Sequence, residues 1–580
     1  MLAASAQTPP AAPPRNPGFF PLDQVHRGLH ATAWTVFTGT TPEPMDVEIL
    51  GVLHNARGPG HDMILAQLHG AHAEYTGVVA GMSGSPVYIG DKLLGALSYR
   101  IGQFAKDPIA GITPIAQMLE VRDLPLGTAP SASLPTQADG ANTVQPMETP
   151  LVMSGFAPEA LRFWQKQLAG TGLDQVSAGG TGGSGAQSGK MLSAQAAGIV
   201  PGSAVSAQLV RGDMEIAATC TVTYIDPKQL LACGHPILQA GPVSIPMTAA
   251  EVVTTLASPL NAFKIINTGA TIGAFTQDRD SAIRGELGAH ASTVPVSISV
   301  HGAGADRTLH VDVLDLPSLT AQALMVVIYN ALLQSNQSTA SISYHVRGQA
   351  SFANYGPAPL DIWSPASDGT PAGMMAALQT GIAFNRFYAN PARQGALQSI
   401  HLDVEALDRR AEVSLETARL VSSDVVHAGD TITVEAVLRP WQQPARNVRI
   451  PIQLPARLGP GNVRLLVSDA GTLDRALQQP RNPTNDDNGM EAALAEARAE
   501  HAADRVYVSL LMPESQAEMN GQTLPGLPMS MANALEPLRS GQDASLHGES
   551  AVPTASVTTG GLVKGYQVLT VHVDPGGGLN

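Results

Sequence analysis

Two serines in a glycine-rich turn have the most suggestive setting for chemistry in this sequence. The stretch GVVAGMSGSPVYIGDKLLGALSYR, residues 77–100, places Ser83 and Ser85 between apolar runs that are typical of buried strands. Gly81 and Gly84 remove the side chains that would crowd a serine, and they allow backbone N–H groups to point at one spot where an oxyanion could bind. Serine and glycine are also the usual residues of a hairpin turn. The turn alone therefore leaves a nucleophile site and a simple hairpin equally open.

A serine nucleophile needs a base, and a histidine much later in the chain is a candidate. His235 lies in TVTYIDPKQLLACGHPI, residues 221–237, where a predicted hairpin leads directly into a GHP tripeptide. A histidine at the end of a hairpin can equally be a structural residue that hydrogen-bonds to the backbone.

The chain has two cysteines, Cys220 and Cys233, and they flank this hairpin. A turn near Asp226 and Pro227 would place them roughly opposite each other, so a cross-strand disulfide is sterically conceivable in an oxidising compartment. Two buried free thiols are the alternative.

Length and composition favour a multidomain β protein. The 580 residues exceed what one core can organise, and the 57 glycines and 44 prolines favour short strands over long helices. The net charge of −15, with no basic stripe to offset it, argues against a nucleic-acid partner. No apolar run reaches the roughly 18 residues of a membrane-spanning helix.

The first residues resemble the end of a secretory signal. Leu2–Ala6 followed by Gln7 shows small residues at Ala4 and Ala6, which is the pattern before a signal cleavage site. We therefore expect an exported protein, periplasmic or extracellular, whose true start lies upstream. A disordered Pro/Ala tail of a cytosolic protein is the alternative.

Other constellations carry weaker signals. His54, His61, His69 and His72 crowd one region, but their spacings match no common zinc pattern. The glycine-rich stretch 179–190 lacks the GK[ST] ending of a phosphate loop. We predict neither a metal nor a cofactor.

The serine turn and the residues after it resemble the C-terminal half of chymotrypsin-like serine peptidases. GMSGSPVYIGDKLLGALSYRIG and PIAGITPIAQML correspond to a GDSGGP-type turn, a strand pair, a substrate-binding strand, a glycine-led strand and a terminal helix. This resemblance implies that Ser83 is the nucleophile and that the N–H groups of Gly81 and Ser83 form the oxyanion site. It also implies that Ser98, Tyr99 and Arg100 pair with the substrate backbone.

The closer resemblance is to the SpoIVB family of sporulation serine peptidases, which has the GMSGSP string and a GH dipeptide after a TVTYIDP-type strand. This resemblance implies that His235 is the base, although here the histidine follows the serine in the chain. Leu68 and His69 stand where the family has its aspartate. Asp62 is the nearest carboxylate in a strand-like setting, so a dyad with Asp62 as an orienting group is the resulting assignment.

These observations predict a mainly β protein with a chymotrypsin-like double β-barrel core built from two separated, permuted segments. The predicted divisions are a tail at 1–18, the serine half of the core at 19–123, a linker and insertion at 124–193, the histidine half at 194–345, a connecting module at 346–402, an immunoglobulin-like β-sandwich at 403–470 and a C-terminal α+β module at 471–580.

The predicted function is hydrolysis of a protein or peptide substrate through an acyl-enzyme in the cell envelope. The family resemblance suggests narrow specificity or self-cleavage. The alternative is a non-catalytic envelope protein whose degenerate peptidase core binds or assembles. The sequence does not indicate an oligomeric state.

Overall fold

The computed structural model divides into two compact units, Met1–Ser297 with Leu309–Asn330, and Ile298–Thr308 with Ala331–Asn580. The structure describes residues 12–574 except for 15–16, 103–106, 126–143, 148, 150, 172, 174–175, 178, 182–190, 259–261, 303–305, 336–342, 368, 391–394, 424, 478–488, 513–514, 520–521, 528–529, 532–533, 536–543 and 548–549.

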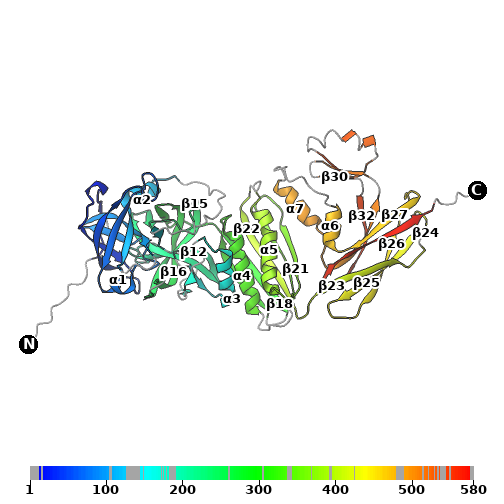
Figure 1. The fold of residues 1–580 in the computed structure, drawn as a ribbon, viewed down its shortest axis with the longest axis horizontal. Helices are drawn as coiled ribbons and strands as arrows, with labels where there is room; N and C mark the ends of the chain where they lie inside the picture. The colour runs from blue at the N-terminus through cyan, green and yellow to red at the C-terminus, as the bar shows by residue number, and fades with distance from the viewer. Residues whose placement is uncertain are drawn as a thin grey trace, which may run out of the picture. The chain divides into compact units, whose positions relative to one another are not determined.

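The first unit begins with a closed barrel of six antiparallel strands, coloured blue in Figure 1. Its strands pair in the order β2-β3-β4-β7-β6-β5, and β5 pairs again with β2. The interior is a cluster of alternating apolar side chains that includes Val47, Ile49 and Leu97. The strands are β2 (His30–Thr35), β3 (Glu43–Leu53), β4 (Met63–His69), β5 (Pro86–Ile89), β6 (Lys92–Ile101) and β7 (Ile109–Pro114).

Six further strands repeat this connectivity in the second half of the unit. They pair in the order β12-β13-β14-β17-β16-β15, and β15 pairs with β12. The strands are β12 (Ala204–Gly212), β13 (Glu215–Ile225), β14 (Gln229–Ala232), β15 (Gly241–Leu256), β16 (Phe263–Arg279) and β17 (Ala282–Leu287). The predicted chymotrypsin-like double barrel is confirmed.

The shared connectivity places the two predicted catalytic residues at equivalent points. In each barrel the chain leaves the third strand, makes an irregular connection and enters the fourth strand. Ser83 lies in that connection between β4 and β5, and His235 lies in it between β14 and β15. The short helix α1 (Ala71–Thr76) precedes the serine turn.

The two barrels pack against each other through apolar side chains and the helix α2 (Ile115–Arg122). One cluster combines Trp34 and Tyr88 of the first barrel, Met118 of α2, and Leu231 and Ala282 of the second barrel. This buried cluster forms an apolar interface between the barrels, separate from the interior cluster of the first barrel.

Part of the segment 124–193, predicted as a linker and insertion, forms regular structure. β8 (Val144–Pro146) pairs with β6 of the first barrel, whereas β9 (Leu151–Ser154) pairs with β13 of the second. The remaining elements are α3 (Pro158–Gln167), β10 (Val176–Ser177) and β11 (Gly179–Thr181). β19 (Arg307–Leu314) pairs with β12, and α4 (Thr320–Ser335) contains the unit boundary.

The second unit opens with three antiparallel strands and a helix. β20 (Ser343–Phe352) pairs with both β21 (Ala358–Ser364) and β22 (Leu397–Leu407), and α5 (Ala372–Tyr388) connects the latter two.

A two-sheet β-sandwich follows, and it extends beyond the boundary predicted at residue 470. Strands from both sides of that boundary share one buried core, which includes Val413, Ile450, Val467, Val508 and Val571. One sheet contains β23 (Glu412–Leu420), β25 (Thr431–Pro440), β26 (Arg446–Gln453) and β33 (Leu562–Lys564); the other contains β24 (Val425–Val426), β27 (Gly461–Ser468), β28 (Arg505–Met512), β32 (Ser550–Thr558) and β34 (Tyr566–Val573) (Figure 1). The helices α6 (Ala470–Leu477) and α7 (Met490–Ala499) are inserted between these strands.

A small sheet of β29 (Ser515–Met519), β30 (Gln522–Leu527) and β31 (Ala544–His547) lies between β28 and β32 in sequence. Within the described ranges, no helix combines the length and apolar character needed to span a membrane.

Candidate active site

Two backbone amides of the serine turn have no backbone partner among the residues that the structure describes. The amides of Met82, Gly84 and Ser85 donate to the carbonyl oxygens of Val79, Leu97 and Met82, respectively. In the described part of the chain, no backbone hydrogen bond originates from the amides of Gly81 or Ser83. These are the two N–H groups that the resemblance assigns to an oxyanion site.

The two serines of the turn differ in their hydrogen bonding. Ser85 Oγ donates to the carbonyl oxygen of Met82 at 2.6 Å. Ser83 Oγ is buried and has no hydrogen-bond partner within the described ranges. A buried hydroxyl without a partner costs stability, which makes Ser83 the serine whose position needs an explanation other than turn formation.

His235 is buried in a state suited to accept a proton. Its Nδ1 lies 2.8 Å from the carbonyl oxygen of Pro236. Because a carbonyl oxygen can only accept, Nδ1 carries the hydrogen and Nε2 is left with a free lone pair. Nε2 is itself buried and has no partner in the part of the chain that the structure describes, and burial lowers the pKa of the ring to about 4. The imidazole is therefore neutral at pH 7.

Hydrogen bonds join the serine turn to the strand that leads toward His235. Thr221 of β13 donates its amide to the carbonyl oxygen of Ser83 at 2.8 Å, and its Oγ1 donates to that of Gly81 at 3.0 Å. The carbonyl oxygen of Thr221 accepts from Cys233 N at 3.2 Å. One residue thus holds both the Ser83 turn and the GHP segment.

Glycine allows this close approach. A Cβ on Gly84 would lie 2.0 Å from the carbonyl oxygen of Thr221 and 2.5 Å from Cys233 N, and a Cβ on Gly234 would lie 2.0 Å from Ser98 Oγ. Both glycines have positive φ, +93° and +72°. Any side chain here would separate the two barrels at the site.

A disulfide joins Cys220 of β13 to Cys233, two residues before the histidine. Of the two alternatives for these cysteines, the structure contains the cross-strand bond. It fixes the start of the GHP segment to the same strand that binds the serine turn.

Asp278 supports the loop that follows the histidine, and sequence reasoning missed it. Its buried carboxylate accepts from the amides of Ile237 at 2.9 Å and Leu238 at 2.6 Å. Burial raises its pKa to about 6, although the backbone hydrogen bonds act in the opposite direction. The signal that could have revealed it is the one carboxylate of this long strand, near its end in AFTQDR.

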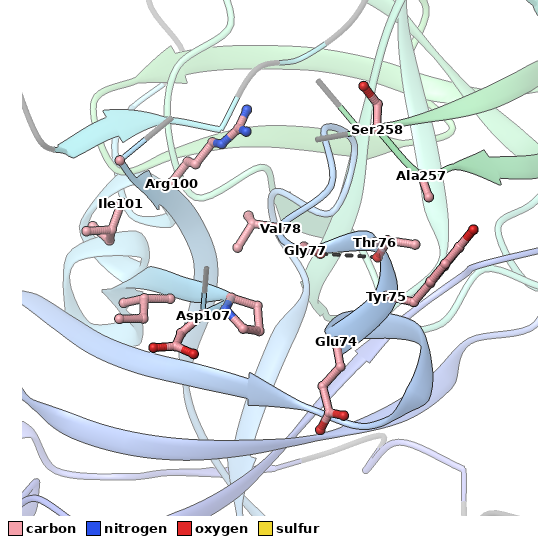
Figure 2. Close-up of a pocket in the computed structure, with 13 residues that line it drawn as sticks. Glu74, Tyr75, Thr76, Gly77, Val78, Arg100, Ile101, Asp107, Ala257 and Ser258 are labelled. Atoms are coloured by element: carbon pink, nitrogen blue, oxygen red, sulfur yellow. Dashed lines mark hydrogen bonds between the residues drawn. The ribbon is translucent and has the colours of Figure 1, made fainter. Parts of the chain in front are cut away.

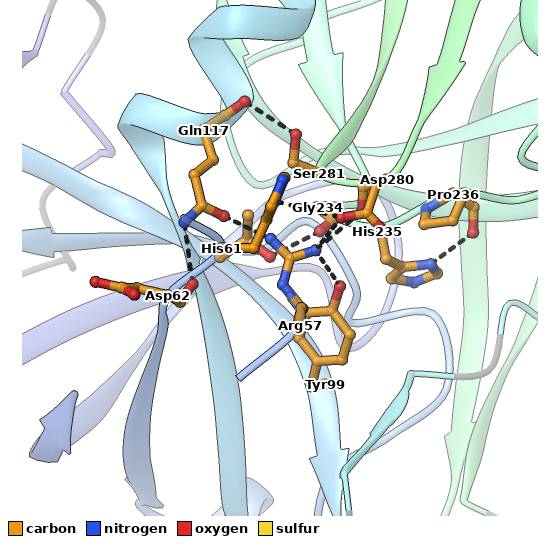
Figure 3. A network of polar contacts seen from close by, with 11 residues as sticks. Arg57, His61, Asp62, Tyr99, Gln117, Gly234, His235, Pro236, Asp280 and Ser281 are labelled. Carbon is orange, nitrogen blue, oxygen red and sulfur yellow. Dashed lines mark hydrogen bonds and ion pairs between the residues drawn. The ribbon is translucent and has the colours of Figure 1, made fainter. Parts of the chain in front are cut away.

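A second polar network, shown in Figure 3, connects the barrels beside His235. The nearly buried guanidinium of Arg57 donates to Tyr99 Oη at 2.7 Å and to the Asp280 carboxylate at 2.8 Å. Gln117 accepts from Arg57 and donates to the carbonyl oxygen of Asp62 at 3.1 Å. Asp280 lies in the turn between β16 and β17.

The Asp62 side chain, predicted as a possible orienting acid, has other partners. Its carboxylate binds His54 Nδ1 at 2.9 Å and the amide of Asn55 at 2.8 Å, and these contacts lower its pKa. The orienting acceptor on His235 is instead the backbone carbonyl of Pro236. The turn from Asn55 to Asp62 closes on itself, and this local closure directs the carboxylate to His54.

A fully buried lysine lies beneath the serine turn. Lys264 Nζ donates to Thr35 Oγ1 at 2.8 Å, and its aliphatic stem packs where a Cβ on Gly81 would lie 3.3 Å away. Burial lowers its pKa to about 7. A single lysine in the apolar run AFKII was the sequence signal for this residue, and it was not recognised.

A cavity of about 350 Å³ lies immediately upstream of the serine turn (Figure 2). Its walls are Glu74 to Val78, the end of β6 at Arg100 and Ile101, the start of β7, and Ala257 with Ser258. Arg100 was predicted to bind substrate; Ser98 and Tyr99 are buried, and neither lines the cavity. Ser83 and His235 lie outside its walls.

The four clustered histidines do not converge. Within the described residues there is no group of three or more metal-ligating side chains. Each histidine has a different neighbour: Asp62 for His54, Asp280 for His61, Glu48 for His69 and the ring of Phe37 for His72.

Comparison with known proteins bears on the first barrel. No curated protein and no solved structure matches the chain. Residues 21–119, which include all six strands of the first barrel and the whole serine turn, match the model of a peptidase family. That family is described as SpoIVB peptidase S55, so the resemblance of this chain to the SpoIVB-type serine peptidases is confirmed for the barrel that carries Ser83.

Proposed function

We propose that the double barrel is a serine endopeptidase in which Ser83 is the nucleophile and His235 is the general base. The observation that carries the proposal is the joining of the two turns: Thr221 binds the carbonyl oxygen of Ser83 and the amide of Cys233. Both turns occupy the same place in their barrels, and Ser83 Oγ and His235 Nε2 are both buried with no hydrogen-bond partner among the described residues.

The proposed reaction follows from these groups. Ser83 Oγ attacks the scissile carbonyl carbon while its proton passes to Nε2 of the neutral His235, and the amides of Gly81 and Ser83 bind the oxyanion. The C–N bond then breaks as Nε2 returns the proton to the leaving amine. Water hydrolyses the ester by the same proton route in reverse.

The Pro236 carbonyl takes the orienting role for which Asp62 was predicted. It fixes the tautomer of His235, as the third group of a triad does. A neutral carbonyl stabilises the imidazolium less than a carboxylate does, and the nearby charges do not compensate, because Arg57 lowers the pKa of His235 more than Asp280 raises it. We therefore expect a dyad that turns over more slowly than a complete triad.

Substrate backbone would pair with Ser98, Tyr99 and Arg100, as the resemblance implies. The support for this placement is the cavity, which lies between the end of β6 and the residues before the serine turn. Its lining is polar, with Arg100, Glu74 and Asp107 at the walls.

The same proposal includes an exported location. The Cys220–Cys233 bond supports it, because disulfides persist in oxidising compartments and are rare in the cytosol of mesophiles. The test is the thiol content of protein from the native source, alkylated before lysis. Two alkylated cysteines would refute an oxidising location.

Labelling with a serine-directed fluorophosphonate tests the mechanism. We expect the label on Ser83, located by peptide mass spectrometry, and its loss in Ser83→Ala. Ser85→Ala is the matched control, because Ser85 Oγ already donates to Met82 and should not be needed. His235→Ala should slow labelling by roughly 10³-fold or more.

Label that persists in Ser83→Ala, or that is lost only in Ser85→Ala, contradicts the choice of nucleophile. Absence of any label under all conditions supports the alternative, a non-catalytic envelope protein that retains the barrels as a binding module.

A further inference from the structure

One edge of β6 is hydrogen-bonded to other segments along its whole length. The segment that pairs with the end of this edge comes from a distant part of the chain. β5 pairs with Lys92–Ala96. The serine turn continues on this edge, because Gly84 N donates to Leu97 O at 2.7 Å and Leu97 N donates to Ser85 O at 3.0 Å. β7 covers the opposite edge. Residues 98–101 are therefore the part of the edge that follows the serine turn directly.

Residues 144–147 lie on this part of the edge. β8 is antiparallel to β6, with Pro146 opposite Tyr99 and Gln145 opposite Arg100. Met147 N donates to the carbonyl oxygen of Ser98 at 2.8 Å. The segment thus pairs with the same three residues to which a substrate backbone is assigned, and it does so in an extended conformation.

A buried side chain anchors the 144–147 segment. Met147 is 2% exposed and belongs to the hydrophobic cluster that also contains Met82 and Val79 of the serine turn. The Pro146 side chain, by contrast, is exposed. The anchor therefore sits next to the nucleophile turn and not on the outer surface of the barrel.

The chain then crosses from the serine barrel to the histidine barrel. Leu151–Ser154 pairs with Glu215–Ala218 of β13. Between the two strands, Thr149 is buried, and its Oγ1 has no hydrogen-bond partner among the residues that the structure describes. A peptide substrate held between Ser83 and His235 would have to follow a similar course.

We propose that the 144–147 segment is a built-in occupant of the peptide-binding edge. It competes with external peptides, and its buried anchor defines the class that the site accepts: extended peptides that carry an unbranched apolar residue at the position of Met147. Adding a strand to an open edge is a general mode of peptide recognition, and a tethered strand outcompetes free peptide through its high effective concentration. The identification of this edge as a substrate edge rests on the proposed function.

The test displaces the segment by Met147→Asp, which places a carboxylate in the apolar cluster. Pro146→Asp is the matched control, because it adds the same charge at an exposed position of the same segment. Met147→Ala provides a milder change if the aspartate variant does not fold, as judged by circular dichroism.

The first measurement is binding, in a Ser83→Ala background so that no chemistry intervenes. A fluorescein-labelled Val-Gln-Pro-Met peptide is titrated and followed by anisotropy. We expect Met147→Asp to bind at least 10-fold more tightly than the parent or Pro146→Asp, and to discriminate against a scrambled peptide. Equal affinity in all three proteins would overturn the proposal.

The second measurement is the rate of fluorophosphonate labelling with Ser83 intact. Labelling that is at least 10-fold faster in Met147→Asp than in Pro146→Asp supports occlusion by the segment. Equal labelling rates would leave the peptidase assignment in place and refute the occlusion. Peptide binding that depends on Met147, without labelling of Ser83 in either protein, would refute the peptidase and retain the occupied edge.

Discussion

Replacing Gly84 by alanine tests whether contact between the barrels builds the site. Gly84 and Gly81 have nearly the same φ, +93° and +94°, so alanine pays the same backbone penalty at both positions, about 1–2 kcal/mol. Their surroundings differ. A Cβ at Gly84 would overlap two backbone atoms of the second barrel, at 2.0 and 2.5 Å, whereas at Gly81 the nearest atom is the flexible Lys264 side chain at 3.3 Å.

The difference in the free energy of unfolding between the two variants measures the effect of the close approach of Gly84 to the second barrel. Backbone atoms cannot rotate away, so Gly84→Ala should add the cost of overpacking, about 1–3 kcal/mol, to the shared strain. We expect Gly81→Ala to lower the free energy of unfolding by about 1–2 kcal/mol and Gly84→Ala by about 2–5 kcal/mol. Gly81→Ala serves as a control for stability only, since the Gly81 amide belongs to the proposed oxyanion site.

The assay is urea unfolding followed by tryptophan fluorescence. Trp34 and Trp164 lie in the first unit, whereas Trp363 and Trp441 lie in the second, so both proteins carry Phe at the latter two positions. The transition then reports the barrels alone. Equal losses of stability in the two alanine variants would refute the inferred contact of Gly84 with Thr221.

Three further predictions concern groups around the site. Lys264→Met should raise the free energy of unfolding at pH 7. In the parent protein, burial lowers the pKa of Lys264 from 10.5 to about 7, so the unfolded chain binds more protons than the folded chain between pH 7 and 10. The free energy of unfolding of the parent should therefore rise over this pH range. If the urea midpoint changed equally between pH 7 and pH 9 in the parent and in Lys264→Met, this prediction would be contradicted. Labelling of Ser83 should remain constant from pH 8 to about 5 and fall only as His235 is protonated, with a midpoint near 4; a midpoint near 6.5 would show that the ring is solvated. Replacing Cys220 and Cys233 together by serine should lower the free energy of unfolding of the first unit by about 3 kcal/mol, measured by the same urea assay. An unchanged urea midpoint would count against a disulfide that constrains the unfolded chain.

The sequence by itself determined the local elements. Period-2 apolar runs indicated the strands of both barrels, and the turn of Gly81, Ser83 and Gly84 indicated a site because glycine and serine have specific backbone and hydroxyl properties. The GMSGSP and GHP strings predicted the family, and the match over residues 21–119 confirms it for the serine barrel. The roles of Ser83 and His235 in catalysis stay predictions.

The sequence was least informative where strands choose their partners. Alternation in the C-terminal region predicted strands but not that β28 and β34, which lie beyond residue 470, would complete the sandwich begun at Val413, since alternation defines a buried face and not the sheet that covers it. For the same reason the sequence did not predict β8, which is only three residues long.

Only the tertiary structure decided which polar groups meet. It directed the carboxylate of Asp62 to His54, gave the Nδ1 of His235 a carbonyl partner, and placed Asp278 beneath the histidine loop. It also brought Met147 onto the edge beside Ser83. The physical reason is that these contacts join segments far apart in the chain, and their free energy depends on burial and direction that no local pattern encodes.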